Sequence, residues 1–260
     1  MGKRIQKLID QMPSLPRVID VGTDHGYVAL GLAWRSDIDR VLATDLRPQA
    51  LAKLEGTLVQ LRRGNARERA VADKIQTAVA DGLKDLPWKD CEGIVISGMG
   101  GSLMTRILRE GLERLPSVRV LVLSPQKNVE EFRHTLVELG GRIEEELVEE
   151  EGKFYDIFRL FLDRPADVAY AKALENPLFA QYGPLLLEKQ HPLLRKKLER
   201  DRRKLMAIQD SWEESAPSGG RGNPAFQRIL RQQEEIDRLL FEFTKKEKGF
   251  GENAKERKEL

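Results

Sequence analysis

Short apolar runs alternate with amphipathic stretches along the first two thirds of the chain. The runs are rich in valine, isoleucine and leucine, and each ends in a polar or glycine-rich turn, as strands buried in a parallel sheet do. Between them, apolar residues recur at spacings of three and four, which is typical of helices with one buried face. The predicted strands are residues 18–21, 40–45, 75–80, 93–97 and 118–123. The pattern therefore predicts an α/β fold with a doubly wound, Rossmann-like sheet.

Two further strands, residues 142–149 and 154–162, are separated only by Glu150–Lys153. So short a connection forces the two strands into an antiparallel pair. A parallel sheet that ends in an antiparallel hairpin is typical of methyltransferase-type doubly wound folds rather than of dehydrogenases. Before the sheet, residues 1–12 are predicted to form a short amphipathic helix that ends at Pro13.

The last third of the chain has a different pattern. Two long helical segments are predicted, with a helix-breaking linker over residues 215–224 between them. Their apolar seams are Leu187, His191, Leu194, Leu198, Leu205, Ile208 and Trp212 in the first, and Phe226, Ile229, Gln233, Ile236, Leu240 and Phe243 in the second. Such seams predict an antiparallel α-helical coiled-coil hairpin. We therefore expect a sheet domain over residues 1–164, a connector with the coiled-coil domain over residues 165–260, and fraying from Lys245 onward.

Composition restricts the class of protein. Of the 260 residues, 40% are hydrophobic and 33% are charged, enough for a substantial core under a well-solvated surface. The start lacks an apolar secretory core, no apolar run approaches the roughly 20 residues of a membrane helix, and the lone Cys91 excludes an intramolecular disulfide. Three histidines and one cysteine, scattered along the chain, form no metal site. We expect a cytoplasmic protein without a metal or a membrane partner, either a monomer or a homodimer.

The turn after the first strand is the most informative segment. It reads Asp20-Val-Gly-Thr-Asp-His-Gly-Tyr27 and leads into the apolar start of a helix, which brings backbone N–H groups to the carboxyl edge of the sheet. A dinucleotide-binding turn has the pattern G-x-G-x-x-G, but the third position here is Asp24. Carboxylates at Asp20 and Asp24, without a P-loop lysine, disfavour a phosphate. They favour a cationic cofactor, S-adenosylmethionine.

The ends of the other strands extend this prediction. Asp45 follows Gly26 by 19 residues, and a carboxylate there can accept both ribose hydroxyls of an adenosine. Asp81, after the third strand, can meet the adenine amino group, and the loop around Gly98 has little side-chain bulk to keep a ligand from the backbone. The predicted cofactor-binding residues are Asp20, Gly22, Thr23, His25, Gly26, Asp45, Leu46, Asp81, Gly82, Ser97, Gly98 and Met99.

Four segments give the chain a family resemblance. They are residues 20–27, Ser97–Gly101, Glu151–Tyr155 and Tyr182–Leu186, the last of which precedes a basic helical segment. With these segments the chain resembles, over nearly its whole length, the bacterial tRNA (adenine-N1)-methyltransferases that modify adenine 22 of tRNA. The resemblance implies a class I methyltransferase domain that uses S-adenosylmethionine, a C-terminal helical hairpin, and tRNA as the partner.

The chemistry that this resemblance implies is in-line transfer of a methyl group to N1 of adenine. The N1 lone pair needs no strong base, so alignment supplies most of the catalysis, and an acceptor near the N6 amino group stabilises the developing positive charge. Asp24 is the predicted acceptor, and Tyr27 is predicted to stack on a base that has left its helical stack. Capping of the following helix is the alternative role of Asp24. Pro125 and Gln126 are predicted either to contact the substrate or only to shape their loop.

A basic run marks the first long helical segment. Between Arg195 and Lys204 there are seven cations and two anions, although the net charge of the whole chain is only +2. Such a run is often a solvated helix face, but it also suits the phosphates of tRNA. The predicted tRNA contacts are Arg195, Lys196, Arg200 and Arg203. Two other functions stay open: a class I methyltransferase acting on another RNA position, a protein or a small molecule, and a non-catalytic module that binds S-adenosylmethionine.

Overall fold

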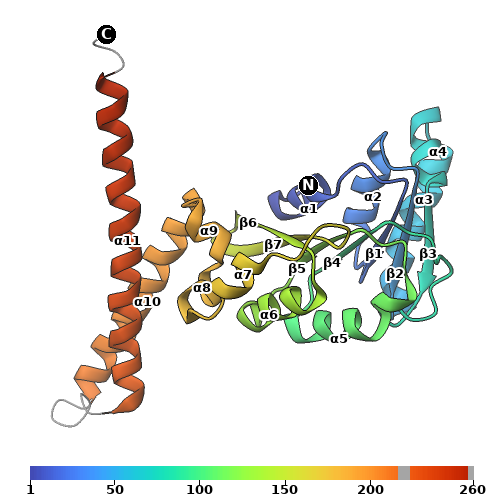
Figure 1. Cartoon of the computed structure of the whole chain (residues 1–260). Helices are drawn as coiled ribbons and strands as arrows, with labels where there is room; N and C mark the ends of the chain where they lie inside the picture. Colours follow the sequence, from blue (N-terminus) through green and yellow to red (C-terminus); the bar gives the residue numbers. More distant parts are fainter. Residues whose placement is uncertain (216–222, 257–260) are drawn as a thin grey trace. The chain divides into compact units, whose positions relative to one another are not determined.

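The computed structural model describes residues 1–215 and 223–256, and it divides into two compact units, Met1–Leu185 and Leu186–Leu260. The first unit is built on a seven-stranded sheet with the order β3-β2-β1-β4-β5-β7-β6 (Figure 1). β1 to β5 are parallel, and β7 is antiparallel to both of its neighbours. The strands are β1 (Arg17–Val21), β2 (Arg40–Asp45), β3 (Ile75–Val79), β4 (Gly93–Ser97), β5 (Val120–Ser124), β6 (Arg142–Glu150) and β7 (Lys153–Phe161).

This sheet confirms the predicted Rossmann-like fold with an antiparallel terminal hairpin. Most strand ends differ from the prediction by one residue at most, but the fifth strand was predicted from residue 118 and β5 begins at Val120. The reason is local, because the N–H of Val118 donates to the carbonyl of Leu115 (3.1 Å) and closes a turn before the strand.

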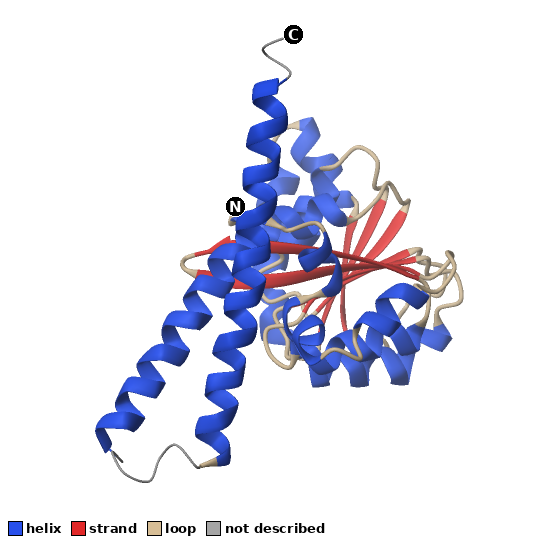
Figure 2. Ribbon diagram, turned by 60° about the vertical axis from the view of Figure 1, so that its left-hand side comes forward, coloured by secondary structure: helices blue, strands red, loops and turns tan. Residues whose placement is uncertain are grey.

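Helices cover both faces of the sheet, as Figures 1 and 2 show. They are α1 (Lys3–Gln11), α2 (Tyr27–Trp34), α3 (Pro48–Arg63), α4 (Ala66–Asp73), α5 (Gly101–Gly111), the short 3-10 helix Leu112–Arg114, α6 (Val129–Leu139), α7 (Val168–Ala173) and α8 (Pro177–Tyr182). Successive strand residues point to opposite faces. Val18 therefore joins the apolar core formed with α1 to α4, while Ile19 joins the core formed with α5 to α8. The strands are thus buried on both faces, which explains their nearly unbroken apolar sequences.

A two-residue turn joins β6 and β7. The strands pair from Arg142 opposite Phe161 to Glu150 opposite Lys153, so that only residues 151–152 remain in the loop. Glu151 (φ +51°) and Gly152 (φ +71°) both adopt the left-handed backbone conformation of a type I′ hairpin turn, whose twist matches that of the flanking strands.

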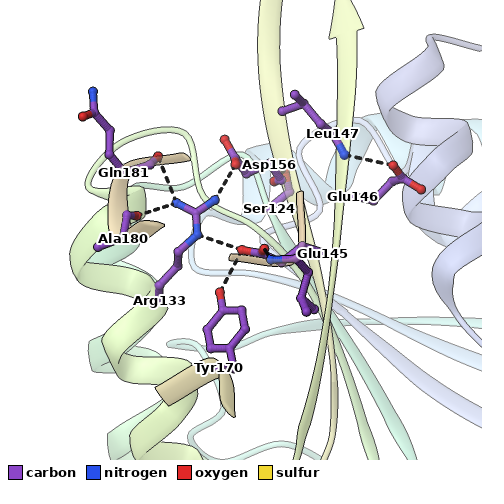
Figure 3. A network of polar contacts seen from close by, with 10 residues as sticks. Ser124, Arg133, Glu145, Glu146, Leu147, Asp156, Tyr170, Ala180 and Gln181 are labelled. Carbon is purple, nitrogen blue, oxygen red and sulfur yellow. Dashed lines mark hydrogen bonds and ion pairs between the residues drawn. The ribbon is translucent and has the colours of Figure 1, made fainter. Parts of the chain in front are cut away.

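A buried polar network holds the segment after β7 against the sheet (Figure 3). Arg133 of α6 is fully buried and donates to Glu145 of β6 (2.8 Å) and to Asp156 of β7 (2.7 Å). It also donates to the backbone carbonyl of Ala180 in α8 (2.9 Å), and the hydroxyl of Tyr170 in α7 donates to Glu145 (2.8 Å). The compact unit therefore includes residues 165–185, which follow the domain boundary that the sequence predicts after residue 164.

The second unit is a helical hairpin. It contains the end of α9 (Pro184–Glu188), α10 (Pro192–Ser215) and α11 (Pro224–Glu256). The two long helices run antiparallel, since Gln190 pairs with Glu242, Arg202 with Asp237, and the Trp212 ring lies 5.6 Å from that of Phe226. Residues 216–222 of the predicted linker lie outside the described residues.

Two details of this hairpin differ from the prediction. Ile208, expected in the apolar seam, is 49% exposed, although Leu194 and Leu198 are fully buried. A repeat of 3.5 residues drifts by roughly 20° per heptad on a helix of 3.6 residues per turn, so a seam position two heptads beyond Leu194 moves off the contact. In addition, α11 continues to Glu256, beyond Lys245 where fraying was predicted.

Candidate functional site

A cavity of about 330 Å³ lies at the carboxyl ends of β1, β2 and β4. β1 has β2 on one side and β4 on the other, so this is the point where the strand order reverses, and ligands of open α/β sheets bind at such points. Its volume falls at the lower end of the roughly 300–1,000 Å³ typical of small-molecule sites. Twelve of the predicted site residues line it: Asp20, Gly22, Thr23, Asp24, His25, Gly26, Tyr27, Asp45, Ser97, Gly98, Met99 and Gln126.

The loop after β1 is fixed by its backbone. The N–H groups of Gly22 and Thr23 both donate to the carbonyl of Thr44 in β2, each at 2.8 Å. Gly22 has a φ of +77°, and a β-carbon there would lie 2.1 Å from the terminal methyl carbon of Met99. The methyl end of the Met99 side chain could move aside, so it is the left-handed backbone conformation of this turn that requires glycine.

Two carboxylates at the floor of the cavity are buried. Asp20 is 4% exposed, and the hydroxyl of Thr23 donates to it at 2.5 Å. Burial raises the pKa of Asp20 from an ordinary 3.8 to about 6, against the lowering effect of the hydrogen bond from Thr23. Asp45, 8% exposed, accepts from the backbone N–H of Arg47 (2.8 Å). The floor therefore favours a ligand that brings a positive charge to Asp20 and hydroxyl donors to Asp45.

A third carboxylate, Asp24, is exposed. Its side chain is 68% accessible, and Oδ2 lies 3.3 Å from Nε2 of His25. Nδ1 of His25 faces Nζ of Lys53 at 3.3 Å. Since a lysine ammonium only donates, Nδ1 is the acceptor and Nε2 carries the hydrogen that points at Asp24. The ring of Tyr27 stacks on that of His25, with the centroids 5.6 Å apart.

The alternative role of Asp24 as a helix cap is wrong. The N-cap of α2 is Gly26, and no side chain caps this helix. Within the described residues, Asp24 has its ion pair with His25 and no hydrogen bond to the backbone of α2. Its carboxylate is therefore free to accept a hydrogen bond from a ligand.

Four predicted site residues of the first unit do not line this cavity. Leu46 is 63% exposed, and Pro125 is buried after β5. Asp81 is exposed and lies 3.5 Å from Lys84, while Gly82 packs near Ile107 of α5. Pro125 precedes Gln126, whose N–H donates to the carbonyl of Met99 (2.8 Å) and ties the loops after β4 and β5 together.

Sequence reasoning missed the contribution of α1. Arg4 and Ile5 line the cavity, as do Val28 and Arg47. Val28 and Arg47 adjoin residues that were predicted, but nothing in the chain before β1 indicates that α1 folds back to the sheet edge. The only available signal was the cationic start of the amphipathic helix, Lys3-Arg4.

The remaining predicted residues lie on α10 of the second unit. Arg195 pairs with Glu199 (3.2 Å) and Arg200 with Asp201 (2.9 Å). Lys196, Arg203 and Lys204 are exposed. Across the described residues of the chain there is no cluster of histidine, cysteine, aspartate or glutamate suited to a metal ion, and no helix there has the length and apolar character that a membrane span requires.

The chain resembles known proteins in sequence and in fold. A curated relative, the tRNA (adenine(22)-N(1))-methyltransferase of Bacillus subtilis strain 168, is 25% identical over 158 residues, which are 60% of this chain and 63% of the relative. The chain thus matches less than two thirds of that relative's length. The crystal structure of a Streptococcus pneumoniae protein, a candidate tRNA (m1A22) methyltransferase, in complex with S-adenosyl-L-methionine has a TM-score of 0.70 and 25% identity. The likeness covers 92% of this chain and 99% of that one.

A second solved structure agrees in fold. The Bacillus subtilis M1A22 tRNA methyltransferase TrmK has a TM-score of 0.73 and 19% identity, and the likeness covers 92% of this chain and 98% of that one. A family model described as a methyltransferase domain matches residues 1–158, which include all of the strands except the end of β7. The cavity at the switch point lies within this match, and the chain belongs to that methyltransferase-domain family.

Proposed function

We propose that this protein transfers the methyl group of S-adenosylmethionine to N1 of adenine 22 in tRNA. Membership of the methyltransferase-domain family supports methyl transfer, and the 25% identical relatives support the tRNA substrate. The observation that carries the proposal is a cavity that combines two buried carboxylates, Asp20 and Asp45, with an exposed one, Asp24.

The cavity fits S-adenosylmethionine in charge and in shape. The ammonium group of its amino-acid end matches Asp20, whose burial leaves a carboxylate that gains most from a cationic partner. The ribose hydroxyls match Asp45. Gly98 leaves room for a ligand to approach the backbone, since a β-carbon there would meet nothing within 4 Å. Leu46, Asp81 and Gly82 remain predicted contacts of the adenosine end.

The mechanism needs orientation more than acid–base chemistry. Bound in the cavity, the cofactor supplies an electrophilic methyl group on a sulfonium sulfur. The lone pair of adenine N1 forms the new N–C bond as the S–C bond breaks, and the positive charge moves to the adenine. Asp24 accepts a hydrogen bond from the N6 amino group and stabilises that charge. The stacked rings of His25 and Tyr27 offer a face to the flipped-out base.

His25 and Lys53 support Asp24 in this scheme. The Nε2–H of His25 points at Asp24 because Lys53 occupies Nδ1. His25 thereby holds Oδ2 of Asp24, and Oδ1 remains to accept a hydrogen bond from the base. Gln126 lines the cavity on that side and is the proposed substrate contact there, while the buried Pro125 before it shapes the loop.

We place tRNA binding on the cations of α10, with Arg195, Lys196, Arg200 and Arg203 as the proposed phosphate contacts. The division into a methyltransferase domain over residues 1–164 and a connector with the coiled-coil domain over residues 165–260 belongs to the same proposal, with residues 165–185 of the connector packed in the compact sheet unit. So does a cytoplasmic location, since that is where tRNA is modified in bacteria. The chain acts as a monomer or a homodimer.

The test is to incubate the full chain with methyl-labelled S-adenosylmethionine and an unmodified tRNA transcript, then digest the RNA and identify the labelled nucleoside. We expect N1-methyladenosine, and none from a matched transcript with guanine at position 22. Label in another nucleoside would point to a different RNA target. No labelled RNA at all would remove the proposed activity.

A further inference from the structure

Arg4 is an arginine in the cavity wall whose guanidinium has no hydrogen-bond or ion-pair partner in the part of the chain that the structure describes. Its side chain lines the cavity from α1. The guanidinium carbon lies 4.9 Å from the centroid of the Tyr155 ring, a cation–π contact that positions the group without using its hydrogen-bond donors. Among the described residues, no carboxylate and no carbonyl accepts a hydrogen bond from this guanidinium. An arginine presents five donors, so a ligand is needed to use them.

Two neighbouring cations, in contrast to Arg4, have carboxylate partners. Lys7, one turn along α1, pairs with Glu146 (2.8 Å), and Arg159 of β7 pairs with Glu144. Glu150 lies beside Arg4, yet it accepts from the backbone N–H of Arg4 (3.4 Å). In a region rich in glutamates, the guanidinium that borders the cavity is therefore left uncommitted.

The position of Arg4 along the cavity identifies the anion. Tyr155 is on β7, and the hydroxyl of Ser124 at the end of β5 donates to the carbonyl of Asp156 (3.0 Å), so Arg4 lies on the β5 side of the switch point. Asp45, the proposed ribose contact, ends β2 on the opposite side. A cofactor with its adenosine at Asp45 and its ammonium at Asp20 of the central β1 has its α-carboxylate beyond β1, toward Arg4.

The geometry points to Arg4 as the residue that binds the α-carboxylate of the amino-acid end of S-adenosylmethionine, with Tyr155 holding the guanidinium in place. This inference rests on the proposed function. It makes α1 part of the cofactor site. It also assigns Arg4 to the cofactor rather than to a phosphate of the tRNA. Both ligands are anions, and the experiment below distinguishes them.

The test is calorimetric titration of the full chain with two ligands. S-adenosylhomocysteine has the amino-acid end, and 5′-methylthioadenosine has the same adenosine and sulfur without it. Arg4→Met keeps the apolar stem and removes the donors. We expect it to weaken S-adenosylhomocysteine roughly 10- to 100-fold, the range of a charge-assisted hydrogen bond, and to change 5′-methylthioadenosine less than about twofold. Arg4→Lys is expected to recover part of the loss.

Two controls complete the design. Lys3→Met removes an exposed cation from the adjacent position of α1 and is expected to leave both affinities unchanged. Tyr155→Phe keeps the ring and is expected to behave as wild type, whereas Tyr155→Leu is expected to weaken S-adenosylhomocysteine alone by a few-fold. Because 5′-methylthioadenosine reports on the rest of the cavity, its unchanged binding shows that each variant is folded.

The outcomes distinguish a failure of the proposed function from a failure of the Arg4 assignment. If wild type binds neither ligand, the proposed function itself fails. If wild type binds both and Arg4→Met binds S-adenosylhomocysteine normally, the assignment of Arg4 is overturned. A normal affinity combined with a raised KM for tRNA would overturn it as well, in favour of a phosphate contact. An equal loss for both ligands would reduce Arg4 to a structural residue.

Discussion

The sheet unit and the helical hairpin hold their charged groups in opposite ways. In the sheet unit, Asp20 and Arg133 are buried: Asp20 accepts a hydrogen bond from Thr23, and Arg133 donates to Glu145 of β6 and Asp156 of β7. In the hairpin, Arg203 and Lys204 are exposed on one helix and have no partner among the described residues. Buried polar groups change free energies by several kcal/mol when their partners are removed, whereas exposed charges act weakly and through salt-dependent fields.

The largest effect is expected at Arg133. Arg133→Met leaves Glu145 and Asp156 buried without their cation, which costs about 3–5 kcal/mol. In a unit of this size that corresponds to a fall in Tm of about 10 °C. Calorimetry on the full chain measures it. The matched control is Arg109→Met, which removes an exposed pair with Glu138 and is expected to cost less than about 1 kcal/mol.

Hydrogen exchange on the same variant distinguishes the two units. We expect faster exchange in the strands of the Arg133→Met variant, with α10 and α11 unchanged. Equal losses of protection in both units would mean that they unfold together.

The next effect is catalytic. Asp24→Ala removes the proposed acceptor of the adenine amino group, so we expect kcat to fall about 100-fold, or roughly 2.7 kcal/mol of transition-state stabilisation. The affinity for S-adenosylhomocysteine should change less than about threefold, because Asp24 is exposed while Asp20 and Asp45 remain. Single-turnover kinetics and calorimetry separate the two. Asp39→Ala, at an exposed position on the opposite edge of the sheet, is the control. Equal losses in kcat and affinity would make Asp24 a cofactor ligand.

Asp20 links stability to function. Its pKa in the folded protein, about 6 against 3.8, means that the folded state binds the proton more tightly than the unfolded state. Stability contributed by this group is therefore present at low pH and lost as the pH rises from about 4 through 6. Asp20→Asn removes the charge and is expected to raise the free energy of unfolding by up to about 3 kcal/mol at pH 7.5, and by about half of that at pH 5.

Urea unfolding at the two pH values measures this gain. The same variant should bind S-adenosylhomocysteine at least tenfold more weakly, since the partner of the ammonium group is gone. Asp39→Asn is the matched control. A variant that is less stable than wild type at pH 7.5 would show that hydrogen bonding, and not burial, dominates at this carboxylate.

Much of the sheet unit could be predicted because its signals are local. Buried parallel strands leave continuous apolar runs, and Gly22 marks in the sequence itself a turn with a left-handed backbone conformation. The start of β5 was misplaced because Val118 is apolar but closes a turn. Arg4 was missed for a different reason. Its place in the site depends on how α1 packs on the sheet, and a helix before the first strand carries no sign of the edge at which it will end.

The smallest effect is expected at the hairpin and tests whether charge there acts on RNA. Arg203→Gln with Lys204→Gln removes two exposed cations that have no described partner, so each lost phosphate contact should flatten the slope of log affinity against log salt by about 0.7–0.9. Filter binding of tRNA from 50 to 300 mM salt measures the slope. Arg202→Gln is the matched control, because Arg202 already pairs with Asp237. S-adenosylhomocysteine binding should not change in either variant. If the slope also stays the same, Arg203 makes no phosphate contact, and this part of α10 is a solvated helix face.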